Sequence, residues 1–101
     1  MCGITGIFCF NSAGKVDATV LTSMRDSMLH RGPDGGENWI SDDKKVGLAH
    51  RRLSIIDLTT SAAQPMANED GRVMITFNGE IYNHLGLRKL LVSKGHIFQT
   101  D

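Results

Sequence analysis

Three groups of residues in this chain could do chemistry together, and the first is Cys2 at the amino terminus. If Met1 is removed, the thiol and a free α-amine sit on the same carbon. An α-amine has a reference pKa of about 7.7–8.0, which suits a general base near neutral pH. A free thiol is only a few per cent ionised there and needs such a base. Cys2 could therefore supply both a nucleophile and its base, and the small residue at position two is compatible with removal of Met1.

The other two groups are the pair Arg51-Arg52 and the dipeptide Asn78-Gly79. Arginine offers a bidentate fork for a carboxylate, but neighbours on a strand face opposite sides, so only one of the pair can reach a site near Cys2. An Asn amide and a Gly backbone N–H can form a two-donor oxyanion hole. Taken alone, an arginine pair usually indicates a solvated surface and Asn-Gly a hairpin turn. A helix rather than a returning strand is expected after Asn78-Gly79, which disfavours the hairpin.

The first ten residues, MCGITGIFCF, are expected to form the strand that positions the thiol. Side chains alternate between faces, so Ile4, Phe8 and Phe10 share a face with Cys2, while Cys9 lies on the other. Both faces are largely apolar, which predicts a strand covered on both sides. Cys9 is expected to be a small buried hydrophobe rather than a reactive group.

A helix, two strands, an extended piece and a loop are expected next. Apolar residues at helical spacing predict a helix over 17–29 with Asp17 as its N-cap. Strands are predicted over 37–41 and 45–52 around a turn at 42–43, followed by an extended piece at 53–58 and a loop over 59–71.

The last part of the chain is expected to contain a strand over 72–78 and a helix over 83–94. Asn83 is the predicted N-cap and Gly95 the stop, while Gly86 inside the helix should cost about 1 kcal/mol relative to Ala. Residues 96–100 are predicted to begin another strand. This order of elements predicts an α+β or layered α/β domain.

Composition limits the classes of function. The chain has 101 residues, 41% of them hydrophobic and 22% charged, which is ordinary for one globular domain. Its formal net charge of zero argues against a non-specific nucleic-acid or anionic membrane surface. No apolar run is long enough to span a membrane, and no signal peptide is apparent. The two Cys would lie about 23 Å apart on one strand, too far for a disulfide, so we expect a cytoplasmic protein.

Four motifs follow one another along the chain: Cys2-Gly3-Ile4, HRGPDG at 30–35, AHRRLSIIDL at 49–58 and FNGEIYNH at 77–84. In this order they resemble the class II glutamine amidotransferase domain, and more closely the N-terminal domain of glutamine-hydrolysing asparagine synthetases. The resemblance implies an α+β fold, the four-layer αββα sandwich of N-terminal nucleophile hydrolases. Residues 1–101 would be the N-terminal part of a type 2 amidotransferase domain. We expect the rest of that domain, and the synthetase domain, to be absent.

The resemblance also implies roles for individual residues. Cys2 would be the nucleophile, Asn78 and Gly79 the oxyanion hole, and Arg52 the group that grips the α-carboxylate of glutamine. The implied substrate-binding set is Arg52, Leu53, Asn78, Gly79 and Glu80. Glutamine would be hydrolysed to glutamate and ammonia through a Cys2 thioester. Ammonia would pass to an ATP-dependent synthetase domain that amidates aspartate or another carboxylate. No metal or cofactor is implied for the glutaminase part, and ATP and Mg²⁺ would belong to the synthetase domain.

Two departures from the family pattern lead to further expectations. The family Asp that binds the α-ammonium of glutamine would lie two residues beyond Asp101, and Met1, while present, acylates the amine of Cys2. We therefore expect the chain as it stands to be a weak or inactive glutaminase. Missing strands would also leave open sheet edges, which a homo-oligomer could cover.

Three other functions are alternatives for this sequence. One is a non-catalytic interaction or oligomerisation domain with a degenerate site. Another is an amidotransferase that acts on a sugar carboxylate in surface-polysaccharide biosynthesis. A metal-binding module is disfavoured because the four histidines (His30, His50, His84 and His96) lack ligand spacing with either Cys.

Overall fold

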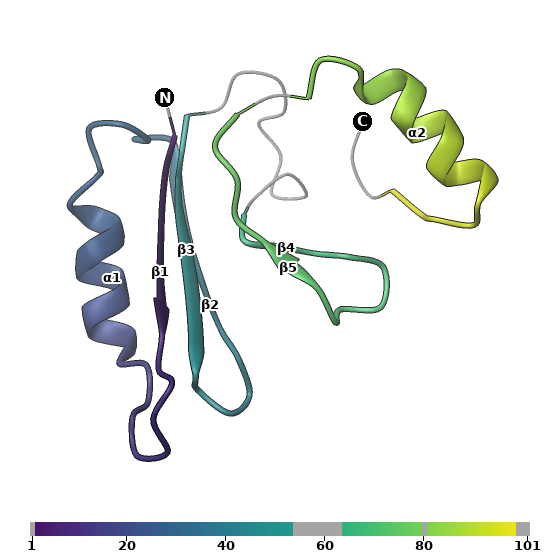
Figure 1. The fold of residues 1–101 in the computed structure, drawn as a ribbon. Helices are drawn as coiled ribbons and strands as arrows, with labels where there is room; N and C mark the ends of the chain where they lie inside the picture. The colour runs from purple at the N-terminus through teal and green to yellow at the C-terminus, as the bar shows by residue number, and fades with distance from the viewer. Residues whose placement is uncertain (1, 54–63, 80, 99–101) are drawn as a thin grey trace.

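The computed structural model describes residues 2–53, 64–79 and 81–98 (Figure 1). A three-stranded antiparallel sheet has the order β1-β3-β2, and its strands are β1 (Gly3–Phe8), β2 (Gly35–Ile40) and β3 (Val46–Arg52). Helix α1 (Ala18–Asp26) packs against this sheet. A two-stranded antiparallel hairpin, β4 (Met66–Ala67) with β5 (Met74–Ile75), and helix α2 (His84–Ser93) follow. This α+β arrangement is compatible with part of an N-terminal nucleophile hydrolase fold.

Helix α1 begins where the sequence predicts but ends at Asp26, three residues before the predicted end, and it contributes Leu21 to the core. The side chain of Asp17 accepts a hydrogen bond from the backbone N–H of Thr19 at 2.8 Å, which satisfies one free donor at the helix start. Leu21 is completely buried, and with Val16 and Ala49 it forms the core of the described structure. Cys9 packs against this core, as expected of a small hydrophobe.

The sheet is covered on only one of its faces along β1. Helix α1 contacts all three strands from the face that carries Gly47 and Ala49. On the opposite face, Ile4 is 46%, Phe8 68% and Phe10 88% exposed. The prediction that both faces of the first strand are covered is therefore wrong for the part of the chain that the structure describes. Alternating apolar residues could not reveal that a single helix covers only one side.

Most predicted elements are confirmed to within two residues. The strands β2 and β3 flank a turn at 41–45, in which the side chain of Asp43 accepts hydrogen bonds from Ser41 and from the backbone of Lys45. Helix α2 ends at Ser93, and Gly95, the predicted stop, follows two residues later with a φ of +95°. Asn83 does occupy the N-cap position, but its side chain makes no capping hydrogen bond, so that part of the prediction is wrong.

Three predicted segments differ from the structure. Strand β4 lies inside the predicted loop over 59–71, and β5 has only two residues instead of the predicted 72–78. Beyond β5, the backbone N–H of Phe77 donates to the side chain of Gln64 rather than to a partner strand. Residues 96–98 are not a strand, because the backbone N–H of His96 bonds back to the carbonyl of Leu91.

Some predictions lie outside the described residues: the extended piece beyond residue 53, Glu80, and the end of the last predicted strand at 99–100. Within the described part, no helix is long and apolar enough to cross a membrane.

Candidate active site

The thiol of Cys2 lies where β3 ends. Strands β1 and β3 pair antiparallel, with Gly3 opposite Arg51 and Ile4 opposite His50. Continuing this register by one residue puts Cys2 opposite Arg52. The Sγ of Cys2 accepts a hydrogen bond from the backbone N–H of Leu53 at 3.3 Å and lies 3.7 Å from the carbonyl oxygen of the same residue. Two of the implied substrate-binding residues, Arg52 and Leu53, are therefore neighbours of the thiol.

The two arginines of the pair face opposite sides of the sheet, as the strand geometry predicts. Arg51 is buried on the face of α1, where its Nε donates to the carbonyl of Gly32 at 2.9 Å and its Nη1 pairs with Asp26 at 3.3 Å. The hydrogen bond from Arg25 and the charge of Arg51 together hold the pKa of Asp26 below its usual value. Arg51 thus ties β3 to the helix side.

Arg52 lies on the opposite face, which it shares by strand alternation with His50 and Cys2. Its backbone carbonyl accepts a hydrogen bond from the N–H of Asp34 at 2.9 Å, and Pro33 bridges to it. The HRGPDG motif therefore packs its backbone against the end of β3. Of the pair, Arg52 is the member on the face of the thiol.

His50 is the most deeply buried polar residue on this face, with 2% of its surface exposed. Its Nε2 lies 3.2 Å from the carbonyl oxygen of Phe77, and its Nδ1 is buried with no hydrogen-bond partner among the described residues. Burial is the main cause that lowers the pKa of His50. The Phe77 carbonyl acts in the opposite direction, and the charge of Arg52 lowers the pKa further. The ring is therefore neutral at neutral pH.

The corner Asn78-Gly79 follows a segment that is held against β3. The hydroxyl of Thr76 donates to the carbonyl of Ala49 at 3.3 Å, and the next residue, Phe77, is the one bonded to His50. Asn78 and Gly79 themselves are exposed. Gly79 has a φ of +159°, and a Cβ built there would lie 3.0 Å from the ring of Phe77, so a side chain at this position would be strained.

The structure thus brings three of the six predicted site residues together at one end of the sheet. Cys2, Arg52 and Leu53 meet there, and the corner Asn78-Gly79 is anchored through His50, which precedes Arg52 by two residues or about 7 Å along the strand. Glu80 lies outside the described residues.

His50 is not among the site residues predicted from the sequence, which names it only as a histidine without metal-ligand spacing. Its position was available from alternation, because residues 50 and 52 share a face of the strand. Among the described residues no group of three His, Cys, Asp or Glu could hold a metal ion.

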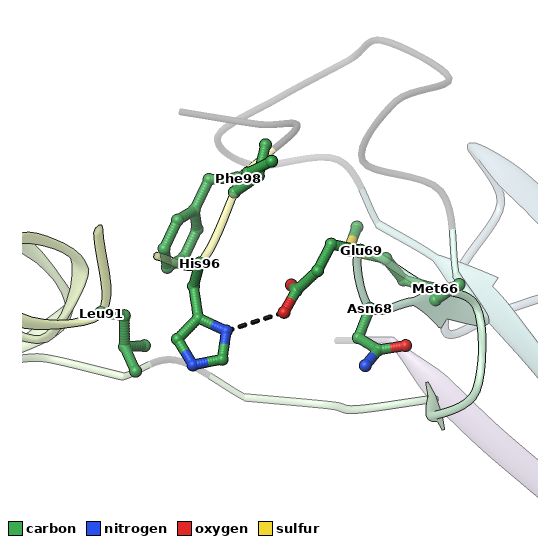
Figure 2. Close-up of a pocket in the computed structure, with 8 residues that line it drawn as sticks. Met66, Asn68, Glu69, Leu91, His96 and Phe98 are labelled. Carbon is green, nitrogen blue, oxygen red and sulfur yellow. Dashed lines mark hydrogen bonds and ion pairs between the residues drawn. The ribbon is translucent and has the colours of Figure 1, made fainter. Parts of the chain in front are cut away.

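A separate cavity of about 270 Å³ lies between β4 and the end of α2 (Figure 2). Figure 2 shows His96 and Glu69 facing each other across it, with Nδ1 and Oε1 2.7 Å apart. The hydrogen bond with His96 is the main cause that lowers the pKa of Glu69. None of the residues predicted for the active site lines this cavity, which is instead bordered by Met66, Ala67, Asn68, Glu69, Leu91, His96, Ile97 and Phe98. The pair fastens the end of α2 to the β4–β5 hairpin.

Comparison with known proteins supports the resemblance. The family model described as "Glutamine amidotransferase domain" matches residues 1–101. The chain is 40% identical over 103 residues to asparagine synthetase [glutamine-hydrolyzing] 1 of Bacillus subtilis, covering 100% of this chain and 16% of that protein. It is 46% identical over 102 residues to asparagine synthetase [glutamine-hydrolyzing] 2 of Arabidopsis thaliana, with 99% of this chain and 16% of that protein covered. Amidase chry2 of Gibberella zeae is 39% identical over 93 residues, which cover 83% of this chain and 14% of that protein.

The chain spans about a sixth of the length of these curated relatives, and it is matched almost from end to end. The family match includes all four motifs and every residue discussed above as a site candidate. The chain therefore belongs to the glutamine amidotransferase domain family.

Proposed function

We propose that this chain is the glutaminase part of an asparagine synthetase-like amidotransferase, in which Cys2 hydrolyses glutamine to glutamate and ammonia. The observation that carries the proposal is the place of the Cys2 thiol. It lies at the end of β3, beside Leu53 and opposite Arg52, in a chain of this family. A nucleophile next to a fork for a carboxylate is what recognition and attack of an amino-acid amide require.

The reaction begins once Met1 has been removed. The α-amine of Cys2 takes the proton of its own thiol, and the thiolate attacks the carboxamide carbon of glutamine. The Asn78 amide and the Gly79 N–H stabilise the resulting oxyanion, and loss of one such donor is worth about 3–4 kcal/mol. The C–N bond then breaks as the leaving nitrogen takes the proton from the amine, and ammonia departs. Water hydrolyses the γ-glutamyl thioester, which releases glutamate and restores the thiol.

Substrate orientation is assigned to Arg52, whose guanidinium forms two parallel hydrogen bonds with the α-carboxylate of glutamine. Arg51 cannot share this role because its side chain is bonded to Gly32 and Asp26 on the helix side. Leu53 contributes its backbone beside the thiol. Glu80 is included in the binding set on the basis of the resemblance alone.

We propose that, in the larger protein, ammonia passes to a synthetase domain that amidates aspartate or another carboxylate. ATP and Mg²⁺ would belong to that domain. The complete amidotransferase domain would be a four-layer sandwich, whose second sheet would cover the face that exposes Ile4, Phe8 and Phe10. A cytoplasmic location and a homo-oligomer through open sheet edges stay predictions.

The experiment compares two forms of the chain, one that retains Met1 and one that begins at Cys2. Both are treated with a diazoketone analogue of glutamine, which alkylates a thiolate, and glutamate release from glutamine is measured in parallel. We expect rapid labelling of Cys2 only in the form that begins at Cys2, and slow glutamate release from the form with Met1. Equal labelling rates in the two forms would show that the amine is not the base.

Labelling also separates the alternatives. In a non-catalytic interaction domain, the glutamine analogue would label Cys2 no faster than iodoacetamide does, because no site would bind the analogue beside the thiol. An amidotransferase that acts on a sugar carboxylate would label as an asparagine synthetase does, so for that alternative the amide acceptor must be identified with the larger protein.

A further inference from the structure

We propose that His50 is a positioning residue for the glutaminase reaction: its neutral ring donates from Nε2 to the carbonyl of Phe77 and thereby orients the Asn78-Gly79 corner toward the thiol. The inference rests on the proposed function, and it assigns a role to a residue outside the catalytic and substrate-binding sets. The observation behind it is the 3.2 Å contact between His50 Nε2 and the Phe77 oxygen.

The ring has only one reasonable hydrogen-bonding state. A carbonyl oxygen can only accept, so Nε2 must carry the proton. Nδ1 is buried and has no partner among the described residues. A bare Nδ1 is an acceptor left unpaired, whereas a protonated Nδ1 would be a buried orphan donor, which proteins rarely tolerate. His50 is therefore the Nε2–H tautomer.

The bond acts on the peptide group that directly precedes the two proposed oxyanion donors. The carbonyl of Phe77 and the N–H of Asn78 belong to one planar peptide unit. Fixing that oxygen sets the plane from which Asn78 and Gly79 continue. The N–H of Phe77 is also held, by the side chain of Gln64 at 2.6 Å. With both polar groups of Phe77 bonded, the exposed corner begins from a fixed backbone.

His50 also ties the corner to the thiol through the sheet. In the antiparallel register His50 lies directly opposite Ile4, which follows Cys2 by two residues. On its own strand, β3, His50 precedes Arg52 by two residues. Two hydrogen bonds link this strand pair to the segment before Asn78 in the described structure. One joins the His50 ring to Phe77, and the other joins Thr76 to Ala49. Misplacing an oxyanion donor by about 1 Å can lower a rate about 100-fold.

The test uses the chain from Cys2 to Asp101, which lacks only Met1, and three variants. His50→Phe removes the donor and keeps a planar ring. His50→Gln keeps an N–H that can reach the Phe77 carbonyl. The matched control is Thr76→Val, which breaks a bond of the same segment to β3 but leaves the Phe77 peptide untouched. Each is labelled with the diazoketone analogue of glutamine over a range of concentrations, and the maximal rate and the half-saturating concentration are separated.

We expect His50→Phe to lower the maximal labelling rate about 10- to 100-fold, with the half-saturating concentration changed less than about threefold, because Arg52 still binds the carboxylate. His50→Gln should restore most of the rate, and Thr76→Val should lose less than about threefold. Labelling by iodoacetamide, which needs no oxyanion hole, should be equal in all four chains. A His50→Phe chain that labels at the original maximal rate would overturn the proposal.

A measurement without any reaction decides the positioning role if labelling fails altogether. In ¹⁵N NMR spectra, the native chain should show a protonated Nε2 and an unprotonated Nδ1 for His50, and the amide signals of Asn78 and Gly79 should move in His50→Phe but not in His50→Gln. If the native chain is not labelled yet these signals behave as expected, the proposed function fails while the positioning role stands. Unmoved corner signals in a folded His50→Phe chain would reject the positioning role.

Discussion

The backbone N–H of Leu53 donates a hydrogen bond to the Sγ of Cys2 at 3.3 Å. The contact joins the residue just before β1 to the residue just after β3, which are 51 positions apart in sequence. It fixes the nucleophile at the end of the central strand of the sheet, since β3 lies between β1 and β2. A reactive group held by a rigid element is better oriented than one on a loop.

The two cysteines should differ in reactivity because they lie on opposite faces of the first strand and its extension. Cys2→Ser should abolish labelling by the glutamine analogue in the chain that begins at residue two. Cys9→Ser should leave the labelling rate within about twofold, because Cys9 packs against the core on the helix side. Mass spectrometry of the labelled peptide is the measurement, and a label found on Cys9 would contradict the assignment.

Substitution of the two adjacent arginines should affect two different properties, the stability of the fold for Arg51 and the binding of the glutamine analogue for Arg52. Arg51→Met leaves the buried carbonyl of Gly32 without its donor, so we expect the free energy of unfolding to fall by about 1–3 kcal/mol. Arg52→Lys keeps the charge but loses the fork. We expect it to raise the half-saturating concentration of the glutamine analogue about tenfold, as loss of one charge-assisted hydrogen bond implies.

Urea unfolding and labelling kinetics on the same preparations check this pair. A reversal, in which Arg51→Met weakens binding at unchanged stability, would show that the wrong arginine has been placed on the face of the thiol.

Alternation along the strands accounts for what could be predicted about the site. Because the side-chain period of a strand is two, the sequence alone required Arg51 and Arg52 to face opposite sides, and the structure has them so. The capped helix α1 was predictable for a similar reason, since Asp17 and the apolar spacing after it act locally.

What could not be predicted depends on contacts between distant segments. The stretch over 72–78 alternates like a strand, yet only Met74 and Ile75 pair, because Phe77 is bonded instead to Gln64 and His50. Nothing local in the sequence indicates those partners. The exposure of Phe8 and Phe10 could not be predicted either. An apolar face indicates that another element can cover it, but it does not identify that element.

The neutral, buried ring of His50 should make stability depend on pH. Its pKa in the folded chain is lowered, mainly by burial, whereas in the unfolded chain it is near the ordinary value of about 6.5. As pH falls below about 6.5, the unfolded state takes up the proton first, so the free energy of unfolding decreases until the lowered folded pKa is reached. The contribution of neutral His50 to the free energy of unfolding is therefore complete above the unfolded pKa, and it is lost as the pH falls toward the lowered folded pKa.

The measurement is urea unfolding of the native chain and of His50→Gln between about pH 7.5 and 5.5. The native chain should lose stability across this range relative to the variant, which has no titrating group at position 50. Four carboxylates in the described part of the chain also have lowered pKa values, but they titrate at more acid pH and are common to both chains: Asp26, Asp43, Glu69 and Asp70. Parallel curves for the two chains would contradict the assignment of a neutral buried His50.

Two glycines at the second helix should respond to alanine in opposite directions. A Cβ built on Gly86 or on Gly95 meets no atom within 4 Å, so neither position is restricted by packing. Gly86 lies inside α2, where Ala is better than Gly by about 0.8–1.0 kcal/mol. Gly95 has a φ of +95°, and a side chain in such a left-handed conformation costs about 1–2 kcal/mol. We therefore expect Gly86→Ala to stabilise α2 and Gly95→Ala to destabilise its end. Amide hydrogen exchange within α2 measures both effects on the same helix, and slower exchange in Gly95→Ala would show that the helix does not end in this conformation.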